Sequence, residues 1–249
     1  MNVFQMLRLP DLVSLLNLIC GIGSIAVAAH NGSFGFALIL LLLAAVADGA
    51  DGYIARRFKG GELGEQLDSL ADAVSFGVAP ALLIYLGFGG EDPLVAIFPA
   101  FYAICGVLRL ARFNSVTTPK IGFEGLPITA ACVMLVTYLL LGQTLVRIDF
   151  LLALTLALSI LMVSTVNYPK IRNIKILAFV ASIFGLTMLL YFIDLKYNME
   201  YMRIFSLLPF ILMLTYIFSP FVRIPLLNNI TSKEYRNTGL KVGGKKGKN

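Results

Sequence analysis

The chain has 249 residues, of which 58% are hydrophobic and 14% are charged. Soluble domains average roughly 45–50% apolar and about 25% charged residues, so this composition excludes an ordinary water-soluble globule and also a disordered chain. In a chain this apolar, the net charge of +6 indicates basic loops at a membrane surface, and nothing in the sequence favours nucleic-acid binding. The three cysteines lie inside apolar runs without paired spacing, which predicts neither a disulfide framework nor a zinc site.

Apolar runs long enough to cross a bilayer recur along the chain, since a transmembrane helix needs about 20 apolar residues. Turn-forming residues such as Asn31-Gly32 and Gly89-Gly90 separate these runs. The predicted spans are Leu12–Ala29, Phe34–Ala55, Gly64–Leu86, Leu94–Ala111, Leu126–Val146, Phe150–Tyr168, Ile174–Ile193 and Ile204–Phe221. We therefore predict an all-α fold, a polytopic membrane helix bundle of about eight transmembrane helices, with Met1–Arg8 as a short interfacial segment.

The basic residues predict the orientation of the bundle. If the N-terminus is cytoplasmic, 17 of the 20 Lys and Arg residues lie inside, and only Arg147, Lys196 and Arg203 lie outside. The positive-inside rule then places both termini on the cytoplasmic side of the cell membrane. Residues 1–230 form the predicted membrane domain. Residues 231–249 form a disordered basic tail that either attracts anionic lipid headgroups or serves only as a topology signal.

Four aspartates lie within the predicted second and third spans. Each carboxylate inside a span costs on the order of 2.5–3.5 kcal/mol by insertion scales, so something must compensate them. Asp48 and Asp51 are three residues apart, and Asp68 and Asp72 are four apart, so each pair shares one helix face. The loop Arg57–Leu63 is short, which predicts an antiparallel hairpin that brings both pairs together at the cytoplasmic end.

Two divalent cations would neutralise the formal charge of the four carboxylates. Ligation by oxygen alone suits hard ions such as Mg²⁺ or Mn²⁺, and a site with two such ions is a common device for displacement at phosphorus. Gly52 and Gly64 would leave room for a bulky polar ligand to touch the backbone, and Arg56 could contact a phosphate. Alternatively, the glycines allow close helix packing and Arg56 is a snorkelling topology residue.

The segment from Asp48 to Asp72 resembles the signature of the CDP-alcohol phosphotransferase family, D-x2-D-G-x2-A-R-x8-G-x3-D-x3-D. All eight specified residues match, and the one departure is a spacing of seven residues in place of eight between Arg56 and Gly64. The matching residues are Asp48, Asp51, Gly52, Ala55, Arg56, Gly64, Asp68 and Asp72. The resemblance implies that an alcohol attacks the β-phosphorus of a CDP-linked donor and releases CMP, and it also suggests a homodimer.

The resemblance also implies roles for these residues. Asp48, Asp51, Asp68 and Asp72 would be metal ligands for two Mg²⁺ or Mn²⁺ ions, and Asp72 would also accept the proton of the alcohol as the catalytic base. The nucleotide and its phosphates would lie near Gly52, Ala55, Arg56 and Gly64. Asn17 and Ser69 could line the same pocket, or they could simply bond a neighbouring helix.

Further stretches resemble phosphatidylserine synthases of this family. They are Leu9–Gly21, Ser75–Ala81, Leu108–Asn114 and Phe123–Pro127. The donor would then be CDP-diacylglycerol, drawn from the membrane lipids, and the acceptor L-serine. Arg109 and Arg112 could bind the serine carboxylate and a lipid phosphate, and Asn114 or Glu124 could meet the ammonium group, unless all four are loop-edge polar residues.

Other acceptors and other classes of protein stay open at this point. Within the family, the acceptor could be choline, glycerol phosphate or an inositol compound, and the donor could be an archaeal ether lipid. In a different class, intramembrane carboxylates could mark an ion or proton transporter, which would leave Arg56 and the glycines without a role. A structural scaffold would explain none of the four aspartates.

Overall fold

The structure is a computed structural model that describes residues 6–30, 32–57, 63–89, 92–115, 123–142, 145–169, 174–197 and 205–221. Its elements are α2 (Leu9–Ala29), α3 (Phe34–Arg57), α4 (Gly64–Asp72), η1 (Ala73–Val78), α5 (Ala79–Phe88), α6 (Leu94–Ser115), β1 (Phe123–Glu124), α7 (Ile128–Leu139), α8 (Ile148–Val163), β2 (Asn167–Tyr168), α9 (Ile174–Tyr197) and α11 (Leu207–Phe218). Most of the predicted interfacial segment Met1–Arg8 and all of the predicted tail 231–249 lie outside the described residues.

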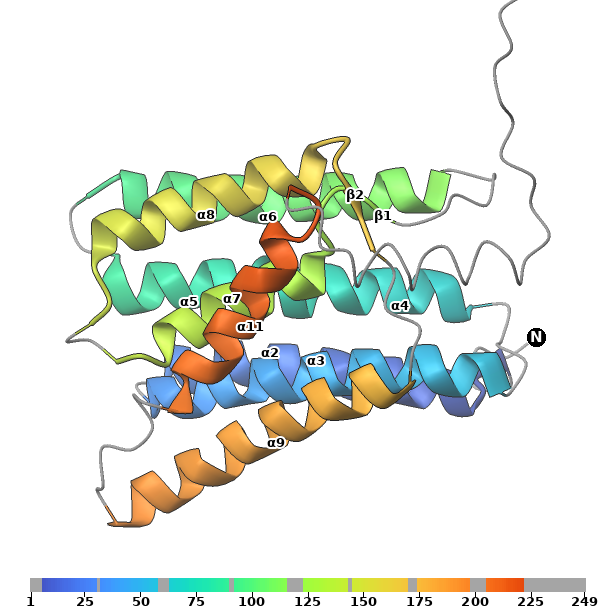
Figure 1. The fold of residues 1–249 in the computed structure, drawn as a ribbon, viewed down its shortest axis with the longest axis horizontal. Coiled ribbons are helices and arrows are strands. Elements are labelled where there is room, and N and C mark those ends of the chain that lie inside the picture. Colours follow the sequence, from blue (N-terminus) through green and yellow to red (C-terminus); the bar gives the residue numbers. More distant parts are fainter. Residues whose placement is uncertain are drawn as a thin grey trace, which may run out of the picture.

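The long helices pack as layers (Figure 1). Helices α6 and α8 pack against each other in one layer, the continuous helix formed by α4, η1 and α5 lies next to α6, and α2 and α3 form the layer beyond. Helix α7 contacts α3, α8 and α11, and α9 packs along α3. Helix α2 packs against both α3 and α4, the two helices that carry the aspartates.

Three described helices are long and apolar enough to cross a membrane. They are Pro10–Ala29, Gly64–Phe88 and Leu94–Ser115. Shorter apolar helices follow the other predicted spans, and large apolar side chains such as Ile19, Ile97 and Phe179 are exposed on the outer faces of the bundle. Side chains of this kind are stable when they face lipid. The prediction of a helical membrane protein is therefore confirmed.

Two predicted spans are too long. The span Leu126–Val146 is helical only over Ile128–Leu139, and the span Phe150–Tyr168 ends as a helix at Val163. Beyond α8 the chain turns into β2, which pairs antiparallel with β1 in the register Phe123–Tyr168 and Glu124–Asn167. Helix α8 ends where the polar residues Ser164, Thr165 and Asn167 begin, so the predicted span ran past this change in polarity.

The helix after Asp72 changes its winding at a proline. Pro80 has no N–H, so the carbonyl of Phe76 one turn earlier lacks its usual helical donor. The segment Ala73–Val78 is π-helical, and the Ala79 N–H donates to the carbonyl of Val74, five residues back. The hydroxyl of Tyr102 on α6 donates to the carbonyl of Phe76 at 3.0 Å, which satisfies that buried acceptor. Single π-helical turns of this kind often lie at functional sites.

Helix α2 approaches this π-helical turn closely because residue 21 is glycine. A Cβ built on Gly21 would overlap the Ser75 hydroxyl and lie 2.7 Å from the Ser75 Cα. In this close contact, the Ser75 hydroxyl donates to the backbone carbonyl of Asn17 at 2.9 Å. Gly21 therefore allows α2 to pack directly against the segment that follows Asp72.

Candidate active site

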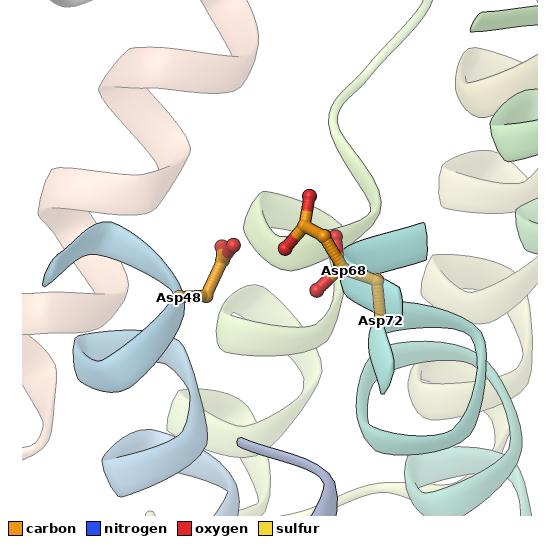
Figure 2. A group of neighbouring side chains, drawn as sticks. All are labelled: Asp48, Asp68 and Asp72. Atoms are coloured by element: carbon orange, nitrogen blue, oxygen red, sulfur yellow. The ribbon is translucent and has the colours of Figure 1, made fainter. Parts of the chain in front are cut away.

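Three of the four predicted metal ligands converge between α3 and α4. Asp48 projects from α3, and Asp68 and Asp72 project from α4 toward it (Figure 2). One carboxylate oxygen from each residue lies within 4.8 Å of the others. Asp48 and Asp68 are half-buried, and Asp72 is only 7% exposed. One carboxylate of α3 and both carboxylates of α4 therefore form a cluster.

Neighbouring helices hold two of these carboxylates through hydrogen bonds. The amide Nδ2 of Asn17 on α2 donates to Asp72 Oδ1 at 3.0 Å. The hydroxyl of Thr129 on α7 donates to Asp48 Oδ2 at 2.9 Å. Asn17 and Ser75 are completely buried, and the Ser75 hydroxyl donates to the Asn17 carbonyl. Hydrogen bonds therefore connect Ser75, Asn17 and Asp72. Second-layer bonds of this kind orient carboxylates for ligation.

The donor set fits a divalent cation. Three carboxylates supply only oxygen ligands, which Mg²⁺ and Mn²⁺ prefer, and a cation would compensate their charge inside an apolar bundle. Two oxygens on opposite sides of one Mg²⁺ are about 4.2 Å apart, since each metal–oxygen distance is about 2.1 Å. One carboxylate oxygen from each of Asp48, Asp68 and Asp72 lies within 4.8 Å of the others, which is close to that distance. The described aspartates could therefore hold a metal ion.

Other predicted site residues lie at the end of α3. The backbone of Asp51, Gly52, Ala55 and Arg56 is helical, and α3 ends at Arg57. Their side chains lie outside what the structure describes, so their predicted roles in binding metal, nucleotide and phosphate stay predictions.

Gly64 begins α4 and lies against the start of α2. A Cβ on Gly64 would be 3.0 Å from Oδ1 of Asp11. Asp11 is almost completely buried, and its Oδ2 accepts the N–H of Arg8 at 2.8 Å, which caps the first turn of α2. Gly64 thus allows the buried carboxylate of α2 to approach the N-terminus of α4, whose dipole favours a negative charge.

Ser69 and Asn114 were predicted for different pockets, and the structure pairs them with each other. Their side chains form hydrogen bonds between α4 and α6, with Asn114 Nδ2 donating to Ser69 Oγ at 3.0 Å. Both residues are half-buried. This geometry favours the alternative in which each bonds a neighbouring helix.

Arg109 lies on α6 near the carboxylate cluster. It is 7% exposed and interacts electrostatically with Asp72 and Asp48. Its guanidinium carbon lies 5.5 Å from the centre of the Phe113 ring, within the range of a cation–π contact. Arg109 therefore brings a positive charge next to the carboxylate cluster.

Arg112, one turn further along α6, has different partners. Its Nη1 donates to the carbonyls of Val163 and Ser164, and its Nη2 donates to those of Met162 and Glu124. The last carbonyls of a helix have no partner within the helix, so Arg112 caps the end of α8. The guanidinium of Arg112 points to the end of α8, which favours the alternative that this arginine is not a substrate ligand.

The segment Phe123–Pro127 completes this cap. Gly125 has a φ of 78°. A Cβ there would overlap the carbonyl oxygen of Met162 and lie 2.5 Å from Arg112 Nη2, so only glycine fits. The backbone carbonyl of Glu124 accepts the 2.6 Å bond from Arg112. The stretches Leu108–Asn114 and Phe123–Pro127 therefore meet at the end of α8.

Comparison with known proteins assigns the family. The family model for CDP-alcohol phosphatidyltransferases matches residues 7–165, which includes the three clustered aspartates and Arg109. The chain belongs to the CDP-alcohol phosphatidyltransferase family. It is a transferase, and the resemblance of Asp48–Asp72 to the family signature is confirmed.

Several curated relatives have names that specify serine. The chain is 37% identical over 174 residues to the archaetidylserine synthase of Methanothermobacter thermautotrophicus, which covers 68% of this chain and 73% of that protein. It is 36% identical over 173 residues to the CDP-diacylglycerol–serine O-phosphatidyltransferase of Methanocaldococcus jannaschii, covering 69% and 79%. A protein of the same name from Helicobacter pylori is 34% identical over 178 residues, covering 67% and 73%.

The sequence alone did not single out several residues around the site. Thr129 on α7 donates to Asp48, Tyr102 on α6 donates to the carbonyl of Phe76 just after Asp72, and Tyr216 on α11 lies near Arg109. These three residues come 30 residues or more after Asp72 in the sequence. A buried threonine or tyrosine in an apolar span is common, so only the spatial contact identifies them. Pro80, four residues after Phe76, was the one available signal for a free carbonyl in this region.

Proposed function

We propose that the protein makes phosphatidylserine by transferring a phosphatidyl group from CDP-diacylglycerol to the hydroxyl of L-serine, with release of CMP. The observation that carries the proposal is the cluster of Asp48, Asp68 and Asp72 within a chain of the CDP-alcohol phosphatidyltransferase family. The names of the curated relatives support serine as the acceptor.

The aspartates would hold Mg²⁺ or Mn²⁺. Asp48, Asp51, Asp68 and Asp72 are the proposed ligands of two ions, and three of them supply oxygens within 4.8 Å of one another. Bound divalent ions would neutralise the charge of the donor pyrophosphate and of the departing CMP. Asn17 and Thr129 would keep Asp72 and Asp48 oriented through their hydrogen bonds.

The transfer itself is a displacement at phosphorus. The serine hydroxyl oxygen forms a bond to the phosphorus that carries the lipid, and the bond from that phosphorus to the CMP oxygen breaks. Asp72 is the proposed base that accepts the hydroxyl proton, since it faces the cluster and is held by Asn17. A carboxylate is a weak base for an alcohol, but an alcohol next to a cation is more acidic.

The donor nucleotide would lie at the end of α3. Gly52, Ala55, Arg56 and Gly64 are the proposed contacts for the cytidine and phosphates, by their match to the family signature. Arg109 is the proposed contact for the acceptor carboxylate, because it is buried beside Asp72. Arg112, whose guanidinium is occupied by the end of α8, is proposed as a structural residue.

The proposed arrangement in the membrane has eight spans. The basic residues support a cytoplasmic location for the active site and for both termini. Residues 1–230 would form the membrane domain, and residues 231–249 a basic tail at the cytoplasmic surface. A homodimer is proposed from the family resemblance.

The acceptor is tested by a direct assay. The protein is purified in detergent, supplied with Mn²⁺ and CDP-diacylglycerol, and given serine, glycerol 3-phosphate, inositol or choline in separate reactions. We expect CMP release with serine. CMP release with another alcohol and none with serine would refute serine as the acceptor. Failure of all four alcohols to support CMP release would contradict the proposed reaction.

The role of Asp72 is tested with Asp72→Asn. This change should abolish turnover and largely spare the binding of CDP-diacylglycerol, because it removes the base and leaves the other carboxylates. Equal loss of donor binding would assign Asp72 mainly to metal ligation. Asp149→Asn is the matched control, since Asp149 is a highly exposed residue at the start of α8.

A second donor is favoured by one relative. The name archaetidylserine synthase of the Methanothermobacter protein points to an archaetidyl donor with the same acceptor. Parallel assays with CDP-archaeol and CDP-diacylglycerol separate the two: the natural donor should have the higher kcat/KM, and serine dependence should be the same with both.

A further inference from the structure

Two tyrosines from distant parts of the chain pack against each other near Arg109. Tyr168 lies on β2 and Tyr216 lies on α11, and their ring centres are 5.8 Å apart. Tyr168 is 1% exposed, and within the described part of the chain its hydroxyl has no hydrogen-bond partner. A buried hydroxyl without a partner is unfavourable, so such a group is a candidate for binding a ligand.

The tyrosine pair connects to the metal cluster through Arg109. The Tyr216 hydroxyl donates to the carbonyl of Pro169 at 3.4 Å. Arg109 on α6 lies near Tyr216 and also near Asp72. The carboxylate of Asp72, the Arg109 guanidinium and the tyrosine pair thus lie in one part of the bundle.

The local fold holds Tyr168 in a fixed position. Tyr168 pairs with Phe123 in the register of β1 and β2. The carbonyl of Glu124, the next residue on β1, accepts the bond from Arg112 that caps α8. Since Arg112 and Arg109 are one turn apart on α6, the same helix positions both the strand pair and the guanidinium.

This arrangement suits the carboxylate of an amino acid. A carboxylate has two oxygens that accept hydrogen bonds, and its charge is best matched by a buried guanidinium and neutral O–H donors. Neither choline nor ethanolamine has such a group, whereas serine presents it two carbons from the hydroxyl that reacts. A site of this kind would therefore select amino acids over amino alcohols.

We propose that Tyr168 and Tyr216, together with Arg109, bind the carboxylate of the serine acceptor, and that the Tyr168 hydroxyl is a specificity-determining donor. This assignment rests on the proposed function, since it requires serine to be the acceptor. The Tyr216 hydroxyl has a smaller role, because it already donates to the Pro169 carbonyl.

The test is Tyr168→Phe in the full-length enzyme in detergent, with Mn²⁺ and CDP-diacylglycerol. We expect the KM for serine to rise about 10- to 100-fold, as for loss of a hydrogen bond to a charged group. The KM for CDP-diacylglycerol and kcat should stay within about twofold. The unfolding temperature should not fall, because the hydroxyl has no partner to lose among the described residues. Tyr85→Phe is the matched control, since Tyr85 is 48% exposed on the outside of α5.

The possible failures are distinguishable. If the wild-type enzyme turns over serine and Tyr168→Phe leaves the KM for serine unchanged, the tyrosine assignment is wrong and the proposed function stands. If the variant unfolds at a lower temperature and loses affinity for both substrates equally, Tyr168 is a structural residue and the assignment is again wrong. If the wild-type enzyme shows no serine-dependent CMP release, the proposed function fails, and the assignment fails with it.

Discussion

Replacing Gly21 with alanine tests whether the contact between α2 and the π-helical turn positions Asp72. The new Cβ would lie 2.7 Å from the Ser75 Cα and would overlap the Ser75 hydroxyl. Carbon atoms in contact are normally 3.5–4.0 Å apart, so the two helices must separate by about 1 Å. The hydrogen bonds from Ser75 to Asn17 and from Asn17 to Asp72 cross this contact, so the displacement reaches the carboxylate of Asp72, the proposed base.

The size of the effect follows from that displacement. Overpacking a buried contact costs about 1–3 kcal/mol of stability. A misplacement of about 1 Å at a catalytic group lowers the rate on the order of 100-fold. We therefore expect Gly21→Ala to fold, to unfold at a lower temperature, and to release CMP on the order of 100-fold more slowly than the wild type.

Gly23 offers a matched control on the same helix. A Cβ on Gly23 would meet only Leu40 Cδ1, at the ordinary contact distance of 3.6 Å. Gly23→Ala should therefore keep its rate of CMP release within about twofold, and the better helix propensity of alanine should offset any small cost. The assay is kcat for CMP release with thermal unfolding in detergent. Equal rates for the two variants would refute the positioning argument.

Three other substitutions probe the supports of the site. Tyr102→Phe removes the hydroxyl that donates to the buried carbonyl of Phe76, which should lower the free energy of unfolding by about 1–3 kcal/mol, and an unchanged unfolding temperature would contradict this role of Tyr102. Thr129→Val removes the hydrogen bond to the α3 carboxylate, so about 10- to 100-fold more Mn²⁺ should be needed for half-maximal activity, and an unaltered Mn²⁺ requirement would count against this role. Arg112→Ala should destabilise the protein by about 1.5–3 kcal/mol, whereas Arg147→Ala breaks only a highly exposed ion pair and should cost about 0–1 kcal/mol. Normal stability together with a raised KM for serine would instead make Arg112 a substrate ligand.

Local pattern was sufficient to predict the helices and the carboxylate cluster. Long apolar runs identify helices in a membrane protein because no other segment satisfies its own backbone in lipid. Spacings of three and four residues place two carboxylates on one helix face, so the convergence of Asp48 with Asp68 and Asp72 followed from the short loop between two helices.

Contacts between distant segments were beyond the reach of local pattern. Arg112 looks like any loop-edge arginine in the sequence, and its partner carbonyls come 50 residues later, at the end of α8. The same holds for Ser69 and Asn114, which separately suggested two pockets and actually bond each other. Each side chain has a plausible polar role alone, and only the packing of α6 against α4 and α8 decides between them.

The central claim is that clustered carboxylates of α3 and α4 hold divalent cations on which phosphatidyl transfer depends. The most direct measurement is serine-dependent CMP release by the purified protein after exhaustive chelation, followed by titration with Mn²⁺. The proposal predicts that the activity disappears on chelation and returns along a saturable curve, which shifts to higher Mn²⁺ concentration in Asp68→Asn. Undiminished activity in the chelated protein would contradict it.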